Sequence, residues 1–503
     1  MKSFATRLKL VAVAAVVLAV GFPTMAEARP APAYLVWDGP SSLTPISPNA
    51  TAYFTATVTN RGGSAARSMT VTSSGSPFSI TSNGCTGVSL RAGRSCQVMV
   101  MFAPTATGAY AGSLYASAKT ASIQALDTVG YAAAALTDVT AIDVGSGQAC
   151  AITTAGALKC WGSNWAGQVG NGTNNNSPVA VQVDGLTAGV TAVSAGGQFT
   201  CAIVSAAAKC WGSNWIGQLG DGTTDNQSRP VQVLGLTSDV TAIGTGDDHA
   251  CAIKLGALYC WGMNWTHEFG DGTTDSSSTP VLIPGMESGV TKLAVGSHHT
   301  CAVVSAVLKC WGANGSGQVG NGDTNEDTRY DDVPTPTPVV NIGLISDIWL
   351  GNNFSCVLLP DGSEQCWGDD GDGQLGNGGD YSGPNSWVPV QVTDITAGIG
   401  VSITASAGHA CVLVSASPST GNEARCWGRN GDGQLGVGDT SDRYTPTQVQ
   451  GMASDVSAIS AGWMHTCAVM SNAQVKCFGA GGDGQLGNGA STDSTTAVTV
   501  MAV

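Results

Sequence analysis

The chain has 503 residues, of which 68 are glycine and 11% are charged, whereas charged residues make up about 25% of an average globular domain. Glycine costs about 1 kcal/mol in a helix interior, so this composition excludes a coiled coil or a helical bundle. The formal net charge is −15 at pH 7, and no basic run offsets it. Nucleic acids and anionic membrane surfaces are therefore poor partners, because binding them requires clustered positive charge.

The first 28 residues predict a signal peptide. Basic side chains precede an apolar run at 10–20, which is too short to span a bilayer. Ala26-Glu27-Ala28 then provides a small-x-small cleavage site. No later run is long enough to span a membrane, so we expect no membrane insertion. The sequence predicts cleavage near Ala28 and a secreted, periplasmic or cell-surface location, where disulfides persist.

Residues 32–133 predict a β-sandwich, because short strand-like runs alternate with turn signals. Phe54-Thr-Ala-Thr-Val-Thr-Asn-Arg-Gly62, Leu90-Arg-Ala-Gly-Arg-Ser-Cys96 and Phe102-Ala-Pro-Thr-Ala-Thr-Gly108 are similar to the Hydin-like or abnormal-spindle-like immunoglobulin-type domain. The resemblance implies an immunoglobulin-like sandwich, a disulfide between Cys85 and Cys96, and an interaction or spacer module without catalytic chemistry.

Residues 138–503 contain an internal repeat that cysteines mark. Fourteen cysteines form seven couples whose first members are 50 to 56 residues apart, by subtraction of their positions. Each couple ends in Cys-Trp-Gly, or in Cys-Phe-Gly at Phe478, and a glycine-rich turn follows. The third turn departs from the pattern with His267-Glu268-Phe269. The couples are Cys150 with Cys160, Cys201 with Cys210, Cys251 with Cys260, Cys301 with Cys310, Cys356 with Cys366, Cys411 with Cys426, and Cys467 with Cys477.

Each repeat predicts four short strands, as at 139–143, 149–153, 157–161 and 178–183. A four-stranded unit of about 50 residues that occurs seven times is typical of a β-propeller, whereas a β-solenoid would use shorter coils. The predicted fold class is therefore all-β, with a seven-bladed β-propeller at 138–503 preceded by the immunoglobulin-like β-sandwich.

Hairpin register predicts how the fourteen cysteines pair. With Cys150 opposite Cys160, the hairpin has a three-residue loop at 154–156, and the same placement in the second repeat leaves a two-residue loop at 205–206. The loop length changes, yet the cysteines remain opposite each other, with Cβ atoms about 4.5–5.5 Å apart. One cross-strand disulfide per repeat follows. Zinc ligation is disfavoured because it needs a C-x₂₋₄-C spacing.

The motif Val-x-x-Ile-x-x-Gly-x-x-His-x-Cys, followed by Cys-Trp-Gly-x-Asn-x-x-Gly-Gln-Leu-Gly-Asn-Gly, resembles the repeat of the regulator of chromosome condensation. The resemblance covers roughly 138–503 and implies a seven-bladed propeller, although the cysteine couples depart from the family pattern. The family's founding member is a nucleotide exchange factor for a nuclear small GTPase and binds chromatin. Export contradicts both roles, so guanine nucleotide exchange is not expected here.

One repeat position, two residues before the first cysteine of each couple, holds most of the histidines. Because phenylalanine fills this position in two repeats, we interpret it as a loop-packing residue that hydrogen-bonds backbone, with a functional histidine cluster as the alternative. Along the chain the position holds Gln148, Phe199, His249, His299, Phe354, His409 and His465.

The remaining motifs predict no chemistry. The Asp-Gly-Gln turns lack the closing bidentate Glu of a calcium loop and are interpreted as plain turns. The tryptophans that follow the second cysteines are interpreted as packing between blades, whereas Trp165, Trp215 and Trp265 lie further on, in the turn, as candidates for exposure. No hydrolase, zinc-protease or phosphate-loop motif occurs, so we expect no enzyme, cofactor or metal.

The loop before each first cysteine varies between repeats on an otherwise repeated frame, as partner recognition requires. The sequence therefore predicts a secreted, monomeric, non-catalytic protein-binding scaffold, anchored by Trp463 and Met464. The alternatives are an enzyme inhibitor, like the secreted β-lactamase inhibitors among propellers of this family, and a cell-surface or adhesion protein. The predicted partner-binding residues are Gln148, Gln198, Asp247, Asp248, His298, Asn352, Asn353, Trp463 and Met464.

Overall fold

The computed structural model describes residues 31–40, 43, 46–323, 331–379, 384–395, 400–417 and 421–503. The predicted signal peptide at 1–28 lies outside these residues. The regular elements of the described chain are all β-strands, so the all-β prediction is confirmed. In this part of the chain, no helix is long and apolar enough to cross a membrane.

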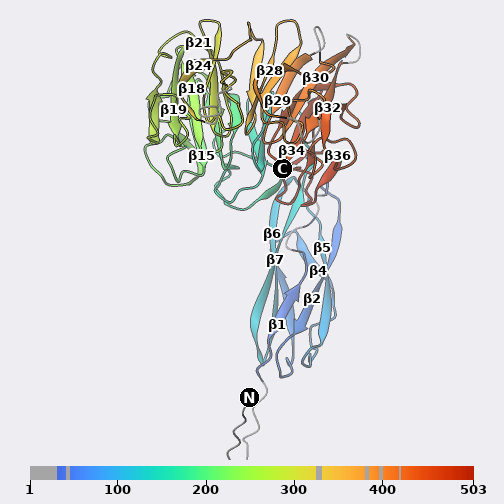
Figure 1. Cartoon of the computed structure of the whole chain (residues 1–503). Helices are drawn as coiled ribbons and strands as arrows, with labels where there is room; N and C mark the ends of the chain where they lie inside the picture. Colours follow the sequence, from blue (N-terminus) through green and yellow to red (C-terminus); the bar gives the residue numbers. More distant parts are fainter. Residues whose placement is uncertain are drawn as a thin grey trace, which may run out of the picture.

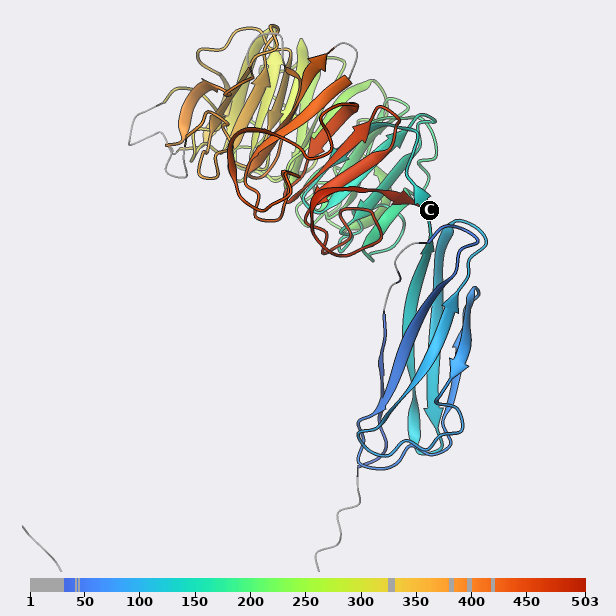
Figure 2. The ribbon, with the colours of Figure 1, turned by 90° about the vertical axis from the view of Figure 1, so that its right-hand side faces the viewer.

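Two antiparallel sheets form the elongated segment below the larger part of the molecule (Figures 1 and 2). Val58 and Val100 of one sheet and Val71 and Leu114 of the other belong to a single buried core. Cys85 and Cys96 form a disulfide in this segment. The first sheet has the order β1 (Leu35–Asp38), β2 (Ala52–Asn60), β5 (Ser95–Phe102), β4 (Phe78–Asn83), and the second β3 (Thr70–Ser74), β6 (Gly108–Ala118), β7 (Ala121–Ala132).

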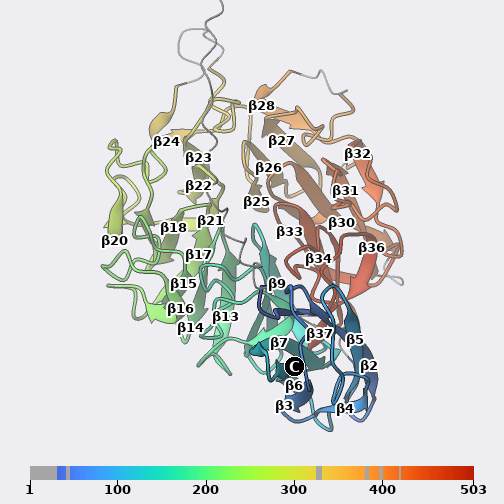
Figure 3. The ribbon, with the colours of Figure 1, turned by 90° about the horizontal axis from the view of Figure 1, so that it is seen from below.

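Four-stranded antiparallel units follow one another along the rest of the chain, and in each unit consecutive strands are neighbours. They are arranged around a common axis (Figure 3). The first units are β9 (Val139–Val144), β10 (Gln148–Thr153), β11 (Leu158–Gly162), β12 (Ser177–Gln182); β13 (Val190–Ala195), β14 (Phe199–Val204), β15 (Ala207–Gly212), β16 (Gln227–Gln232); and β17 (Val240–Thr245), β18 (His249–Lys254), β19 (Ala257–Gly262), β20 (Ser277–Leu282).

The later units repeat the same strand order. They are β21 (Val290–Val295), β22 (His299–Val304), β23 (Val307–Gly312), β24 (Val333–Pro338); β25 (Asp347–Leu350), β26 (Phe354–Leu358), β27 (Glu364–Gly368), β28 (Ser386–Gln391); β29 (Gly400–Ala405), β30 (His409–Ser417), β31 (Gly421–Gly428), β32 (Arg443–Gln448); and β33 (Val456–Ala461), β34 (His465–Met470), β35 (Val475–Gly479), β36 (Ser494–Thr499). The four strands predicted for the first repeat agree with β9 to β12 to within a residue or so at each end.

The hairpins have the predicted register. Cys150 pairs with Cys160, and Gly156 in the three-residue loop has a φ of 72°. In the second unit, Ser205 and Ala206 form the two-residue loop with φ of 52° and 64°, as a type I′ turn requires. The change of loop length therefore leaves the cysteines opposite each other, as expected.

Each predicted cysteine couple of the repeat region forms a disulfide between the second and third strands of its unit. The paired Cα atoms are 4.0 to 4.1 Å apart, and all fourteen side chains are fully buried. The predicted pairing is thus confirmed in every unit. The disulfides join Cys150 to Cys160, Cys201 to Cys210, Cys251 to Cys260, Cys301 to Cys310, Cys356 to Cys366, Cys411 to Cys426, and Cys467 to Cys477.

A tryptophan joins each unit but the last to the unit before it, which confirms the predicted packing role, whereas in the last unit Phe478 fills the position and lies against Gly436. Trp261 is fully buried, and its Nε1–H donates to the carbonyl of Gln218 in the preceding glycine-rich turn at 2.9 Å. Gly220 lies against this ring with a φ of +67°, and a Cβ there would come within 2.8 Å of Trp261 Nε1. The same bond links Trp211 to Gln168, Trp311 to Glu268, Trp367 to Gln318 and Trp427 to Gln374.

The first and last units close the ring with the same contact. Trp161 donates to the carbonyl of Gln485 at 2.9 Å, although the sequence alone did not predict how the ends would meet. In addition to this contact between the first and last units, β8 (Ala134–Ala135) pairs with β37 (Met501–Ala502), and β37 pairs with β12. Both ends of the repeat region therefore join the sheet of the first unit.

Candidate binding face

The loops that vary between repeats surround the mouth of a central cavity. The first strand of each unit lines this cavity, whose volume is about 260 Å³. Asp247, Ser297, Asn352 and Trp463 lie in its wall, and all four belong to the loops that precede the first cysteines. The face that carries these loops is called the loop face below.

Eight of the nine predicted partner-binding residues retain some solvent exposure. Gln198 and Trp463 are exposed, and Trp463 is 44% exposed despite its large apolar side chain. The half-buried members are Asp247, Asp248, His298, Asn352, Asn353 and Met464.

Gln148 corrects the prediction, because its side chain is fully buried. Its Nε2 donates to the carbonyls of Gly196 and Phe199 in the next unit, at 3.1 and 3.0 Å. The prediction placed Gln148 in the variable loop. It occupies the repeat position two residues before the first cysteine, which His249 fills in the third unit. Gln148 is therefore a link between units, and it is not part of the loop face.

Three of the four histidines at this position are also buried links, but their partners are side-chain hydroxyls rather than the backbone groups that were predicted. The fourth, His465, is buried as well, but within the described part of the chain it has no such partner, because the next unit offers Ala149 at the equivalent position. His249 Nε2 lies 3.0 Å from Thr300 Oγ1, and His409 Nε2 lies 2.8 Å from Thr466 Oγ1, each in the next unit. His299 has the same relation to Ser355 at 2.9 Å. Where the position holds phenylalanine, at Phe199 and Phe354, the next unit has Ala250 and Ala410 instead of a hydroxyl.

These histidines are neutral in the folded chain. Burial lowers the pKa of His249 to about 4 and that of His299, His409 and His465 to about 3. The Thr466 hydroxyl donates to the Gln434 carbonyl at 2.8 Å, so it must accept from His409 Nε2–H. The neutral His409 ring therefore uses its Nε2–H to bind the next unit. Because the ring is buried, it does not serve as an acid or base at the surface.

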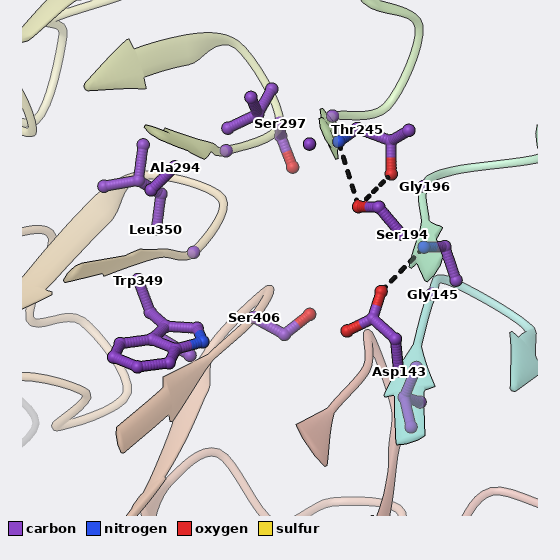
Figure 4. Close-up of a pocket in the computed structure, with 18 of the residues that line it drawn as sticks. Asp143, Gly145, Ser194, Gly196, Thr245, Ala294, Ser297, Trp349, Leu350 and Ser406 are labelled. Atoms are coloured by element: carbon purple, nitrogen blue, oxygen red, sulfur yellow. Dashed lines mark hydrogen bonds between the residues drawn. The ribbon is translucent and has the colours of Figure 1, made fainter. Parts of the chain in front are cut away.

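Asp143 is the other notable group in the cavity wall, and Figure 4 shows it beside Ser194 and Thr245. Its Oδ2 accepts the backbone N–H of Ala195 at 2.7 Å, and Ser460 Oγ lies 3.3 Å from its Oδ1. Burial raises the pKa of Asp143 to about 6, while these hydrogen bonds limit the rise. Similar bonds across the inner strands run from Thr245 N to Ser194, Ala461 N to Thr404 and Val144 N to Ser460.

A second, apolar pocket of about 350 Å³ lies where the second, third and fourth units meet. Trp215 and Trp265 form its aromatic wall, with ring centroids 5.7 Å apart and planes at 66°. They are 52% and 58% exposed, as was anticipated for these turn residues. Met263 and Ala313 complete the apolar lining.

The carboxylate side chains of Asp248 and Glu268 also line this pocket. Asp248 Oδ1 accepts Trp215 Nε1–H at 3.0 Å and Gln218 Nε2–H at 2.8 Å. Glu268 is fully buried and accepts the N–H and Oγ1–H of Thr266 at 2.9 and 2.7 Å. His298 Nδ1 lies 3.6 Å from Glu268 Oε1, an ion-pair distance.

The charged groups of this cluster shift one another's pKa values. Burial alone would raise the pKa of Glu268, but His298, His249 and the bonds from Thr266 hold it at about 2. The same contact with Glu268, reinforced by Asp247 and Asp248, raises the pKa of His298 against the effect of burial. The pocket was not predicted, although the unusual His267-Glu268-Phe269 turn was its signal in the sequence.

Comparison with known proteins identifies the repeat. Residues 156–203, 210–253, 256–303 and 426–469 match the family model of the Regulator of chromosome condensation (RCC1) repeat, and 456–485 match a second model of that repeat. The probable E3 ubiquitin-protein ligase HERC4 of Homo sapiens is 34% identical over 154 residues, which cover 29% of this chain and 14% of the ligase. The Ultraviolet-B receptor UVR8 of Arabidopsis thaliana is 30% identical over 162 residues, 31% of this chain and 35% of the receptor.

Solved structures share the fold. Yeast RCC1 (Prp20), crystallised with Kap60, superposes with a TM-score of 0.60 at 20% identity, over 71% of this chain and 85% of that one. Human WBSCR16 gives a TM-score of 0.57 at 20% identity, over 66% and 87%. The curated relatives are spanned only in part, and these structural identities show the fold alone. The chain carries RCC1 repeats, and its repeat region has the fold of an RCC1-like propeller.

Proposed function

We propose that this chain is a secreted, non-catalytic protein-binding scaffold, in which a seven-bladed propeller presents its loop face and an immunoglobulin-like sandwich at 32–133 acts as a spacer. The observation that carries the proposal is the contrast between frame and loops. The buried tryptophan bonds and disulfides repeat from unit to unit, whereas the residues around the cavity mouth differ in each unit. A rigid frame with varied loops is suited to recognition.

Trp463 is the proposed anchor on this face. It is 44% exposed at the cavity mouth, and large aromatic residues supply much of the binding energy in protein interfaces. Met464 lies beside it, and Gln198, Asn352 and Asn353 supply polar groups around the ring. The partner is proposed to be a protein, and the scaffold to be a monomer that uses neither nucleic acid nor a cofactor.

Export is part of the proposal. All sixteen cysteines of the chain are in disulfides, and disulfides persist in secreted, periplasmic and surface proteins. The acidic chain, with a net charge of −15, suits a soluble protein without a phosphate-bearing partner.

The relatives support binding more than catalysis. Yeast RCC1 was crystallised with Kap60, and the binding of Prp20p to Gsp1p and histones has been described for that protein. HERC4 is a probable ligase, but the matched segment is 14% of its length. We therefore propose neither ligase activity nor guanine nucleotide exchange for this chain.

Affinity capture from the native environment, with the full exported chain as bait, tests the proposal. Trp463→Ala should lower capture of the partner at least about tenfold, the loss expected for an interface anchor. Leu255→Ser is the matched control, because Leu255 is 73% exposed in the hairpin loop at the opposite end of the strands. Equal capture by wild type and Trp463→Ala, or an equal loss in both variants, would contradict the assignment.

A cell-surface or adhesion role is the second candidate, favoured by the elongated two-sheet segment that precedes the propeller (Figure 2). Fractionation separates the two roles, because a surface protein remains with the cells and a soluble scaffold remains in the medium. An enzyme inhibitor is the outcome if the captured partner is an enzyme whose activity falls on binding.

A further inference from the structure

We propose that the pocket between Trp215 and Trp265 binds a methylated or quaternary ammonium group. The inference does not depend on the proposed protein-binding function, because a small cation tests it without a protein partner.

The two indoles provide the surface that such a cation requires. A cation is attracted to the face of an aromatic ring, and tryptophan is the strongest of the aromatic side chains in this respect. The rings contact each other at 5.7 Å and 66°, yet each stays more than half exposed. The Trp215 ring is held in place by its Nε1 bond to Asp248 at 3.0 Å, so the wall is preorganised.

Charge around the pocket selects a cation rather than a neutral apolar group. Asp247, Asp248 and Glu268 contribute three carboxylates, against the single imidazole of His298, which lies 3.6 Å from Glu268 and 3.9 Å from Asp247. An excess of negative charge therefore remains behind an aromatic wall even when His298 is protonated.

The lining discriminates among cations. Lysine and arginine bring N–H donors that must find acceptors. The lining is almost wholly apolar. Asp248 Oδ1 already accepts from Trp215 and Gln218, and both Glu268 oxygens accept from Thr266, which leaves Asp248 Oδ2 as the main acceptor for several entering N–H groups. A quaternary ammonium has no N–H to leave unsatisfied, and its methyl groups fit an apolar wall.

The neighbouring junction provides an internal comparison. Between the first and second units, the residues equivalent to Met263 and Glu268 are Ser213 and Gln218, so a neutral polar side chain replaces both the methionine and the buried carboxylate there. Trp165, the counterpart of Trp215, is 70% exposed. The combination of two contacting tryptophans, a methionine and a buried carboxylate occurs where the second and third units meet.

Titration of the full chain with tetramethylammonium, followed by tryptophan fluorescence and calorimetry, tests the site. We expect saturable binding, with Trp265→Leu weakening it about tenfold and Trp265→Phe weakening it less, in the order of their attraction for cations. Trp165→Leu is the matched control and should bind as wild type does. Thermal melting of each variant shows whether the fold is retained.

The charge requirement is tested by pairing choline with its neutral isostere 3,3-dimethylbutanol, which should bind at least about tenfold more weakly. Glu268→Gln should weaken choline binding while the isostere is unaffected. Tighter binding of a trimethyl-lysine peptide than of choline would assign the group to a protein side chain, and the reverse would assign it to a free solute. Equal binding of choline and the isostere, an equal loss in Trp165→Leu, or no saturation would overturn the proposal.

Discussion

Val144 and Ser460 are 316 residues apart in the sequence, and the backbone N–H of Val144 donates to Ser460 Oγ at 3.1 Å. This bond lies on the cavity wall, where the last unit meets the first. The corresponding bond from Thr245 N to Ser194 Oγ, also 3.1 Å, joins units that are consecutive in the chain. The ring is thus closed without a covalent link, by the type of hydrogen bond that connects neighbouring units elsewhere.

Ser460→Ala should therefore loosen the seam between the first and last units. It leaves a buried N–H without its acceptor, at a cost of about 1–3 kcal/mol. Ser194→Ala removes the equivalent acceptor between units that the chain also connects, and it serves as the control. We expect a larger rise in amide hydrogen exchange at Val144 in the first variant than at Thr245 in the second. Equal exchange at both positions would show that the seam is no weaker than other junctions.

The buried histidines make stability depend on pH. The pKa of His409 is held at about 3 by burial, whereas an unfolded histidine titrates near 6.5. Below that pH the unfolded chain takes up a proton that the folded chain does not, so stability falls as pH falls from about 6.5 toward 3. Each such histidine costs about 2 kcal/mol at pH 5, from the gap between pH 5 and the unfolded pKa.

The double variant His409→Phe with Thr466→Ala should remove the contribution of one histidine to the pH dependence of stability. It reproduces the Phe354 and Ala410 pair of the preceding junction, so the packing should be retained. Urea unfolding at pH 5 and pH 7 measures the change. Thr466→Ala alone should be destabilised at both pH values, since His409 Nε2–H then loses its acceptor. If the double variant keeps the wild-type difference between the two pH values, His409 is not responsible for it.

Prediction from sequence succeeded where all the interacting residues lie within one unit. The opposition of Cys201 and Cys210 and the Ser205-Ala206 loop follow from hairpin register, which is local. The partner of His409 could not be found in this way, because Thr466 is 57 residues away in the next unit. Gln148 was wrongly predicted to lie on the loop face, because glutamine is usually a surface residue. Its burial follows from an amide hydrogen bond to the next unit, which the sequence of one repeat does not show.

The Trp215–Trp265 pocket escaped prediction for a related reason. It combines Trp215, Glu268 and His298 from three successive units, and no single repeat contains the arrangement. Two departures from the repeat were visible in the sequence: His267 replaces the glycine, and Glu268 the glutamine, that the other glycine-rich turns carry at these positions. Departures that cluster in one unit of a regular repeat therefore mark a site better than the repeated residues do.

Asp143 should make an opposite contribution to the pH dependence. Burial raises its pKa to about 6, above the unfolded value of about 3.9, so the folded chain binds the proton more tightly. Stability from this group falls as pH rises from about 4 to 6 and is constant above that. Asp143→Asn retains an oxygen acceptor for Ala195 N–H, and it should be more stable than wild type at pH 7 by up to about 3 kcal/mol, from the gap between the two pKa values. Denaturant unfolding at pH 4 and pH 7 measures this, and an unchanged difference between the two pH values would exclude the carboxylate as its source.

Glu268→Gln should lower the pKa of His298, since Glu268 is the main cause of its rise. The variant places in the third unit the residue found at Gln218 in the second, where its Oε1 accepts the N–H of Ile216 at 3.1 Å, so the turn should be preserved. The pKa should fall only in part, because Asp247 lies 3.9 Å from His298 Nε2. An NMR titration of the His298 ring protons measures it, with Asp225→Asn on an exposed loop as the control. A pKa that stays the same in Glu268→Gln would mean that Asp247 and Asp248, rather than the buried glutamate, hold the proton on His298.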